Sequence, residues 1–152
     1  RGNVETRMGK VDAGLFDATL LAEAGLTRLD MKDVTRYPIS EEIIVPAPGQ
    51  AAIAVQTRDE DGELQTLLQQ IHDAKTEREV TIERSLLKRL GSGCALPLGC
   101  VCHIEGETAE LRVFYANASG TEHYLATHRT PLSDIDTLLS QLIERLQHIT
   151  TA

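Results

Sequence analysis

The order of amphipathic segments in the second half of the chain most constrains its fold. Apolar residues at helical spacing predict a helix over residues 76–90, with Thr76 and Glu79 as a capping box. Turn residues then separate three strand-like runs, at residues 98–105, 109–116 and 122–130. A last helix is predicted over residues 133–148, with one apolar face and Ser133 as its cap. This order predicts an α+β unit in which helices cover a three-stranded antiparallel sheet.

The first half of the chain alternates shorter helical and strand-like segments. A helix is expected to begin after Asn3, its N-cap, and to stop at Gly14. Two prolines and a glycine in Pro46–Gly49 interrupt both helix and sheet, so this segment is the predicted hinge. The remaining expected elements are strands at 17–22, 41–45 and 51–57, a helical turn at 23–29 and a helix at 63–71.

The composition, with 41% hydrophobic and 25% charged residues, is typical of a globular domain. No apolar run approaches the roughly 20 residues that span a bilayer. Residues 1–20 also lack the apolar centre of a secretion signal, so we predict a cytoplasmic protein without membrane insertion. The net charge of −8 argues against a general nucleic-acid binder, because phosphate contacts need surplus Lys and Arg.

Two arginines near the start of the chain form a candidate anion site. Arg1 and Arg7 lie close to a predicted helix N-terminus, whose free N–H groups also attract anions. The six basic residues among residues 1–36 balance the six acidic ones, so the acidic surplus lies elsewhere in the chain. Exposed arginines at a helix start are usually only solvated, and the residues alone leave that alternative open.

The most unusual stretch is Gly91-Ser92-Gly93-Cys94, where a helix ends in glycines and a cysteine follows. Glycines allow a ligand to approach the sulfur, and a cysteine in such a loop is a plausible nucleophile. The alternative is a small apolar residue in a turn. A phosphate-binding loop is disfavoured, because its glycines precede a helix.

Three cysteines within residues 94–102 cannot complete a disulfide framework and therefore indicate a reducing compartment. A zinc site formed by Cys94, Cys100, Cys102 and His103 must be weighed. The spacing differs from common zinc knuckles, and on a strand Cys100 and Cys102 would face away from His103. We expect no metal, with these two cysteines as apolar residues of the sheet.

Five segments in order resemble the porphobilinogen deaminases. The similarity is convincing over about residues 1–105 and holds in outline beyond them. The matching segments are RGNVETR at 1–7, DA-x-LLA-x-AGL-x-RL at 17–29, PAPGQAA at 46–52, VTIERSLLKRL at 80–90 and GSGCALPLG at 91–99.

This resemblance implies an enzyme, hydroxymethylbilane synthase, that joins four porphobilinogen molecules with loss of ammonia in haem biosynthesis. It implies a dipyrromethane primer linked through a thioether to Cys94. Arg1, Arg7 and Arg28 match the arginines that bind the carboxylates of cofactor and growing oligopyrrole, which suits bidentate guanidinium groups. Gln50 would lie beside the substrate cleft.

The resemblance also implies a division into three parts. Residues 1–45 would be the later half of a periplasmic-binding-protein-like α/β domain. Residues 46–75 would form the hinge and the strand and helix that return to the first domain, and residues 76–152 the cofactor-bearing α+β domain. The family's catalytic aspartate would lie before Arg1. We therefore expect the isolated chain to be inactive and to need an N-terminal half. The resemblance also implies that the full enzyme is a monomer.

Three positions depart from the family pattern. Ala51 and Ser92 stand where the family usually has glycine, and Gly91 stands where it often has glutamate. The change at Ala51 is expected to stiffen the hinge. A non-catalytic binding or assembly module of the same fold is the alternative function.

Overall fold

The computed structural model describes residues 2–91 and 96–150. It divides the chain into two compact units, Arg1–Ser40 and Glu41–Ala152.

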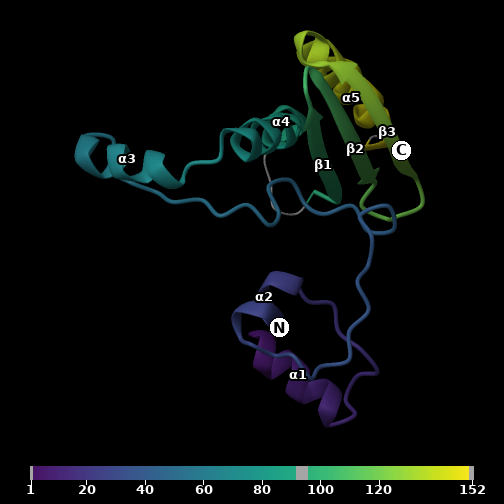
Figure 1. Cartoon of the computed structure of the whole chain (residues 1–152). Coiled ribbons are helices and arrows are strands. Elements are labelled where there is room, and N and C mark those ends of the chain that lie inside the picture. The colour runs from purple at the N-terminus through teal and green to yellow at the C-terminus, as the bar shows by residue number, and fades with distance from the viewer. Residues whose placement is uncertain (1, 92–95, 151–152) are drawn as a thin grey trace. The chain divides into compact units, whose positions relative to one another are not determined.

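The first unit contains two short helices, α1 (Val4–Asp12) and α2 (Glu23–Arg28) (Figure 1). The predicted N-cap is confirmed, because the side-chain oxygen of Asn3 accepts the Thr6 N–H at 2.8 Å. Gly25 of α2 lies against Val4 of α1, where an added Cβ would stand 3.4 Å from the valine methyl. Leu26 is the buried hydrophobic residue of this unit among the described residues.

The strand predicted at residues 17–22 is wrong, because this segment has no regular structure. Leu20 is exposed, as are Leu15 and Phe16 just before it. A strand requires a hydrogen-bonded neighbour. The described residues of this unit provide none, and an apolar run alone does not make a sheet.

The second unit confirms the predicted three-stranded sheet. The strands are β1 (Leu98–Glu105), β2 (Thr108–Ala116) and β3 (His123–Pro131), joined antiparallel in the order β1-β2-β3. In the observed register Cys100 lies opposite Val113, and Leu111 lies opposite His128. The helical segments are α3 (Gly62–Leu68), the 3₁₀ turn Gln69–Ile71, α4 (Ala74–Gly91), the 3₁₀ turn Leu132–Asp134 and α5 (Ile135–Thr150).

Helices α4 and α5 cover one face of this sheet, as Figure 1 shows. Alternation along β1 and β2 sends every second side chain into the core, including Cys100, Cys102 and Leu111. From the helices, Leu86 and Leu146 are fully buried against them. The mixed fold class with helices over an antiparallel sheet is thus confirmed.

Two predicted caps are wrong. Asp73 caps α4 in place of Thr76, since its carboxylate accepts the Thr76 N–H at 2.7 Å. Glu79 is drawn away from the capping position because its carboxylate accepts the Ile104 N–H of β1 at 2.7 Å. Ser133 lies inside the 3₁₀ turn that precedes α5, where its hydroxyl donates to Asp134.

The strands predicted at 41–45 and 51–57 are also absent. Residues 45–50 instead run as an irregular segment beside β1. The Cys100 N–H donates to the Pro46 carbonyl at 2.8 Å. A Cβ on Gly99 would lie 2.6 Å from the Val45 carbonyl oxygen, so this close approach requires glycine. Because Gly99 has no Cβ, the predicted hinge segment can lie against β1 within this unit.

Candidate functional site

Arg7 and Arg28 are held by the two helices of the first unit. Arg7 is one helical turn beyond Val4 on α1, and Arg28 is one turn beyond Gly25 on α2. Val4 and Gly25 are in contact, so the backbone positions of Arg7 and Arg28 each lie one helical turn along the chain from that contact. Arg7 is half-buried and Arg28 is exposed.

The nearby cations of this unit are engaged differently. Arg36 pairs with Glu23 at 2.9 Å, and Lys32 pairs with Asp30 at 2.8 Å. Within the described residues no ion pair involves Arg7 or Arg28. Both guanidinium groups are therefore available to an anionic ligand, whose carboxylates they can bind in bidentate fashion.

Gln50 occupies a tight turn in the second unit. Its N–H donates to the Ala47 carbonyl at 3.0 Å, and its side chain is exposed. The residues on either side have left-handed backbone conformations, with φ of 77° at Gly49 and 71° at Ala51. Alanine is strained in this region, which glycine adopts freely. The departure at Ala51 thus falls at a position whose backbone favours the family's glycine.

Glu83 is a buried carboxylate that the sequence analysis missed. It is 6% exposed on α4, and its two oxygens accept the Gly49 N–H at 2.6 Å and the Cys102 N–H at 2.9 Å. Burial raises the pKa of this carboxyl, while the two backbone N–H groups oppose the shift. A signal was present, since an acidic residue between Ile82 and Leu86 interrupts the apolar face of the helix.

The thiols of Cys100 and Cys102 belong to the core. Burial raises the pKa of Cys102 to about 12, and burial likewise raises the pKa of Cys100, with Glu83 nearby adding to both effects. Both therefore stay protonated and unreactive at neutral pH. His103 points to the opposite, exposed face, where its Nε2 lies 2.6 Å from the Glu41 carboxylate.

The zinc arrangement is consequently not assembled by its described members. Cys100 and Cys102 turn into the core while His103 turns out of it. Within residues 2–91 and 96–150, no group of three or more His, Cys, Asp or Glu residues is placed to hold a metal ion.

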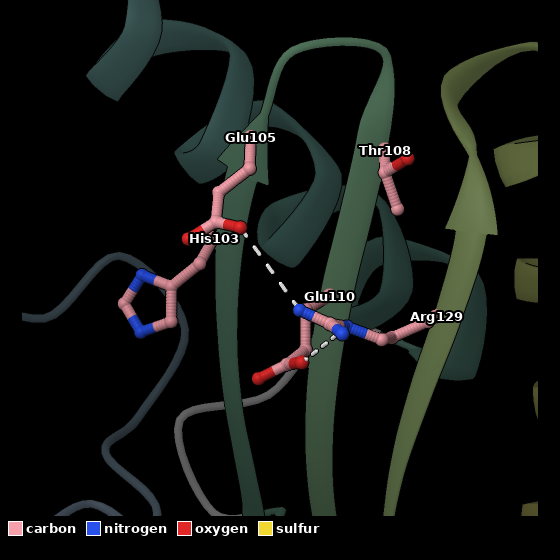
Figure 2. A pocket seen from close by; sticks show the side chains of 5 residues that line it. All are labelled: His103, Glu105, Thr108, Glu110 and Arg129. Carbon is pink, nitrogen blue, oxygen red and sulfur yellow. Dashed lines mark ion pairs between the residues drawn. The ribbon is translucent and has the colours of Figure 1, made fainter.

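The face of the sheet opposite α4 and α5 carries a pocket of mainly charged residues. Figure 2 shows Arg129 between Glu105 and Glu110, with its guanidinium 2.7 Å from Glu110 and 4.0 Å from Glu105. His103 and Thr108 complete the lining. The cation is already paired with two carboxylates, so this pocket does not offer the free positive charge that an acidic pyrrole requires.

Comparison with protein-family models gives two matches in chain order. Residues 1–66 match the model described as porphobilinogen deaminase, dipyromethane cofactor binding domain. Residues 77–136 match the porphobilinogen deaminase C-terminal domain. The chain belongs to the porphobilinogen deaminase family. The members of this family are transferases that act on porphobilinogen in tetrapyrrole (haem) biosynthesis, and the family's cofactor is dipyrromethane.

The described residues fit the dipyrromethane of a porphobilinogen deaminase. Its pyrroles carry acetate and propionate groups, and Arg7 and Arg28 are unpaired guanidinium groups within the cofactor-domain match. Arg1 and Cys94 lie outside the described residues, as does Ser92. The described chain resumes with Leu96, after α4 has ended at Gly91 with φ of 99°.

No helix in the described part of the chain is both long enough and apolar enough to cross a membrane.

Proposed function

We propose that this chain is the cofactor-bearing portion of a hydroxymethylbilane synthase, the deaminase that joins four porphobilinogen molecules head to tail. The observation that carries the proposal is the match to both family models in their order along the chain. The cofactor would be a dipyrromethane attached through a thioether to Cys94. When bound, it supplies the primer on which the tetrapyrrole is assembled.

Each proposed site residue has a distinct task. The Cys94 sulfur would form the covalent bond, since Cys100 and Cys102 are buried with raised pKa values. Arg1, Arg7 and Arg28 would bind the acetate and propionate groups of cofactor and substrate. Gln50 would contact the substrate from the turn beside β1.

The three-part organisation is also part of this proposal. Residues 1–45 would complete an α/β domain, residues 46–75 would hold the hinge and return to the first domain, and residues 76–152 would carry the cofactor. Catalysis would need an N-terminal half with the acidic catalytic residue. The isolated chain would then be inactive, whereas a longer cytoplasmic enzyme would be an active monomer without nucleic-acid or membrane partners.

Mass spectrometry tests the covalent assignment. The chain would be produced together with an N-terminal half of a porphobilinogen deaminase, and the peptide containing Cys94 examined for added dipyrromethane. We expect the two-pyrrole adduct on that peptide and its loss in Cys94→Ser. Cys100→Ser is the matched control and should keep the adduct, since that thiol is buried. Active protein with an unmodified Cys94 would contradict the proposal.

A further inference from the structure

The turn that holds Gln50 is not stable by itself. The flanking residues Gly49 and Ala51 both have positive φ, and for alanine this conformation is strained. Among the backbone hydrogen bonds of the described residues, the one within this turn runs from the Gln50 N–H to the Ala47 carbonyl. Strained backbone persists only where surrounding contacts determine it. The contacts that hold this turn must therefore come from elsewhere in the unit.

Glu83 supplies the closest of these contacts. One carboxylate oxygen accepts the Gly49 N–H, the residue directly before Gln50, at 2.6 Å. The other oxygen accepts the Cys102 N–H in the middle of β1 at 2.9 Å. A single buried side chain thus joins helix α4, the strand and the turn. Both backbone donors approach an acceptor that carries a full negative charge, which strengthens such hydrogen bonds.

Glu79, one turn earlier on α4, provides an internal comparison. Its carboxylate accepts the Ile104 N–H of β1 at 2.7 Å and lies 3.6 Å from the Lys75 ammonium. It therefore performs the same task on the strand. No hydrogen bond among those of the described residues joins it to the Ala47–Ala51 turn.

We infer that Glu83 is a positioning residue whose carboxylate clamps the Ala47–Ala51 turn to strand β1 and thereby fixes the placement of Gln50. The clamp itself is independent of the reaction. Its effect on substrate binding rests on the proposed function, in which Gln50 contacts the substrate.

The chemistry of the clamp requires a carboxylate of this length. Two N–H donors face the group, so both of its oxygens must accept. A glutamine would present one NH₂ group to one of the two donors, and an aspartate would be one methylene shorter. Burial is the largest influence on the pKa of Glu83 and raises it. The hydrogen bonds from Gly49 and Cys102 lower this pKa, while the nearby Glu79 raises it and His103 lowers it. Protonation would convert one acceptor into a donor and weaken the clamp.

Amide exchange on the whole chain tests the clamp without any activity measurement. In Glu83→Gln we expect exchange of at least one of the Gly49 and Cys102 amides to accelerate about tenfold or more, since the side-chain amide offers its oxygen to only one of the two donors. The matched control, Glu79→Gln, should accelerate exchange at Ile104 and leave Gly49 within about twofold of the wild type. Unchanged protection of both Gly49 and Cys102 in folded Glu83→Gln would overturn the inference.

A measurement on the unmodified chain covers the case in which Glu83→Gln does not fold. The carboxyl carbon of Glu83 and the amide of Gly49 would be followed by nuclear magnetic resonance through an acid titration. We expect both signals to move with one shared midpoint above the ordinary glutamate pKa. If the Gly49 amide does not respond when Glu83 titrates, the two groups are not joined and the inference is overturned.

A double-mutant cycle in the complete enzyme tests the consequence for the reaction. We expect Glu83→Gln to lower kcat/KM by roughly tenfold when Gln50 is present and by less than about twofold in a Gln50→Ala background. Additive losses would show that Glu83 does not act through Gln50. Glu79→Gln should lose similar activity with or without Gln50. If no activity can be assembled, the proposed function fails while the exchange result still decides the clamp.

Discussion

Residues 15–71 and residues 76–150 both contain many apolar side chains, but they use them differently. In the C-terminal domain Leu86 and Leu146 have no exposed surface. In the earlier region Ile53 is 83% exposed, and Ile43 is 77% exposed. Apolar content alone therefore does not produce a core. Two amphipathic helices and three adjacent strands give matching faces within a short stretch of chain, whereas isolated strand-like runs have no partner among the described residues.

The largest effect on the free energy of unfolding is expected at a buried site. Leu86→Ala should lower the free energy of unfolding of the C-terminal domain by about 2–5 kcal/mol, because it leaves a cavity beneath the sheet. Its counterpart, Ile53→Ala, should change stability by less than about 0.5 kcal/mol. Urea unfolding followed by circular dichroism measures both. Equal losses would mean that Ile53 is buried in the folded molecule.

Backbone strain should have a smaller effect in the earlier region. Ala51→Gly is expected to raise the free energy of unfolding by about 1 kcal/mol, since it removes the cost of a left-handed alanine. Ala52→Gly is the matched control, because Ala52 lacks a positive φ. This variant should lose about 0.5–1 kcal/mol through the greater freedom of the unfolded chain. Destabilisation by both changes would contradict the strained turn.

The ion pair between His103 and Glu41 links the two regions within the second unit and makes this link depend on pH. The hydrogen bond that the His103 ring donates to the Glu41 carboxylate raises the pKa of His103. The stabilisation of the folded chain by this ion pair should be complete below the ordinary histidine pKa of about 6.5. It should disappear as the pH rises through the raised pKa of His103. With side-chain exposures of 49% and 45%, the pair is screened and contributes less than about 1 kcal/mol.

Comparison of wild type with Glu41→Gln isolates that contribution. Chemical unfolding across the histidine range should show the pH-dependent loss only when Glu41 is present. His128 contributes with the opposite sign in both proteins, since burial lowers its pKa. Identical pH profiles would exclude a stabilising pair.

The smallest effect is expected on the face of the sheet opposite α4 and α5. Arg129→Ala removes the cation that lies between Glu105 and Glu110 in Figure 2. Because the Arg129 side chain is 67% exposed, we expect a loss below about 0.5 kcal/mol in thermal unfolding. A loss similar to that of Leu86→Ala would show that the core does not dominate this domain.

The C-terminal domain could be predicted from sequence because its signals are local and repeated. Alternation at residues 98–105 and the apolar face at residues 133–148 each recur over several turns or pleats, and both elements form close to the predicted bounds. Strands at 17–22, 41–45 and 51–57 rested on short apolar runs. A short apolar run favours a strand, but the strand forms only where a neighbouring strand pairs with it.

The family and its cofactor could be predicted because the family's motifs stand in order along the chain. The family resemblance identified the cofactor and the enzyme class before any geometry was known. It could not reveal Glu83, since the two hydrogen bonds of this residue join positions 34 and 19 residues away along the chain. The Thr76–Glu79 capping box failed for a related reason: Asp73 caps the helix, and Glu79 accepts the Ile104 N–H of β1, 25 residues away along the chain.

The edge of the sheet formed by β1 has a consequence for self-association. Its outward N–H groups at Cys100, Cys102 and Ile104 donate to Pro46, Glu83 and Glu79, respectively. An exposed strand edge is a template on which other molecules add strands and aggregate. Here an incoming strand would have to displace two carboxylates and a carbonyl. The same contacts that shape the molecule thus oppose its growth into intermolecular sheets.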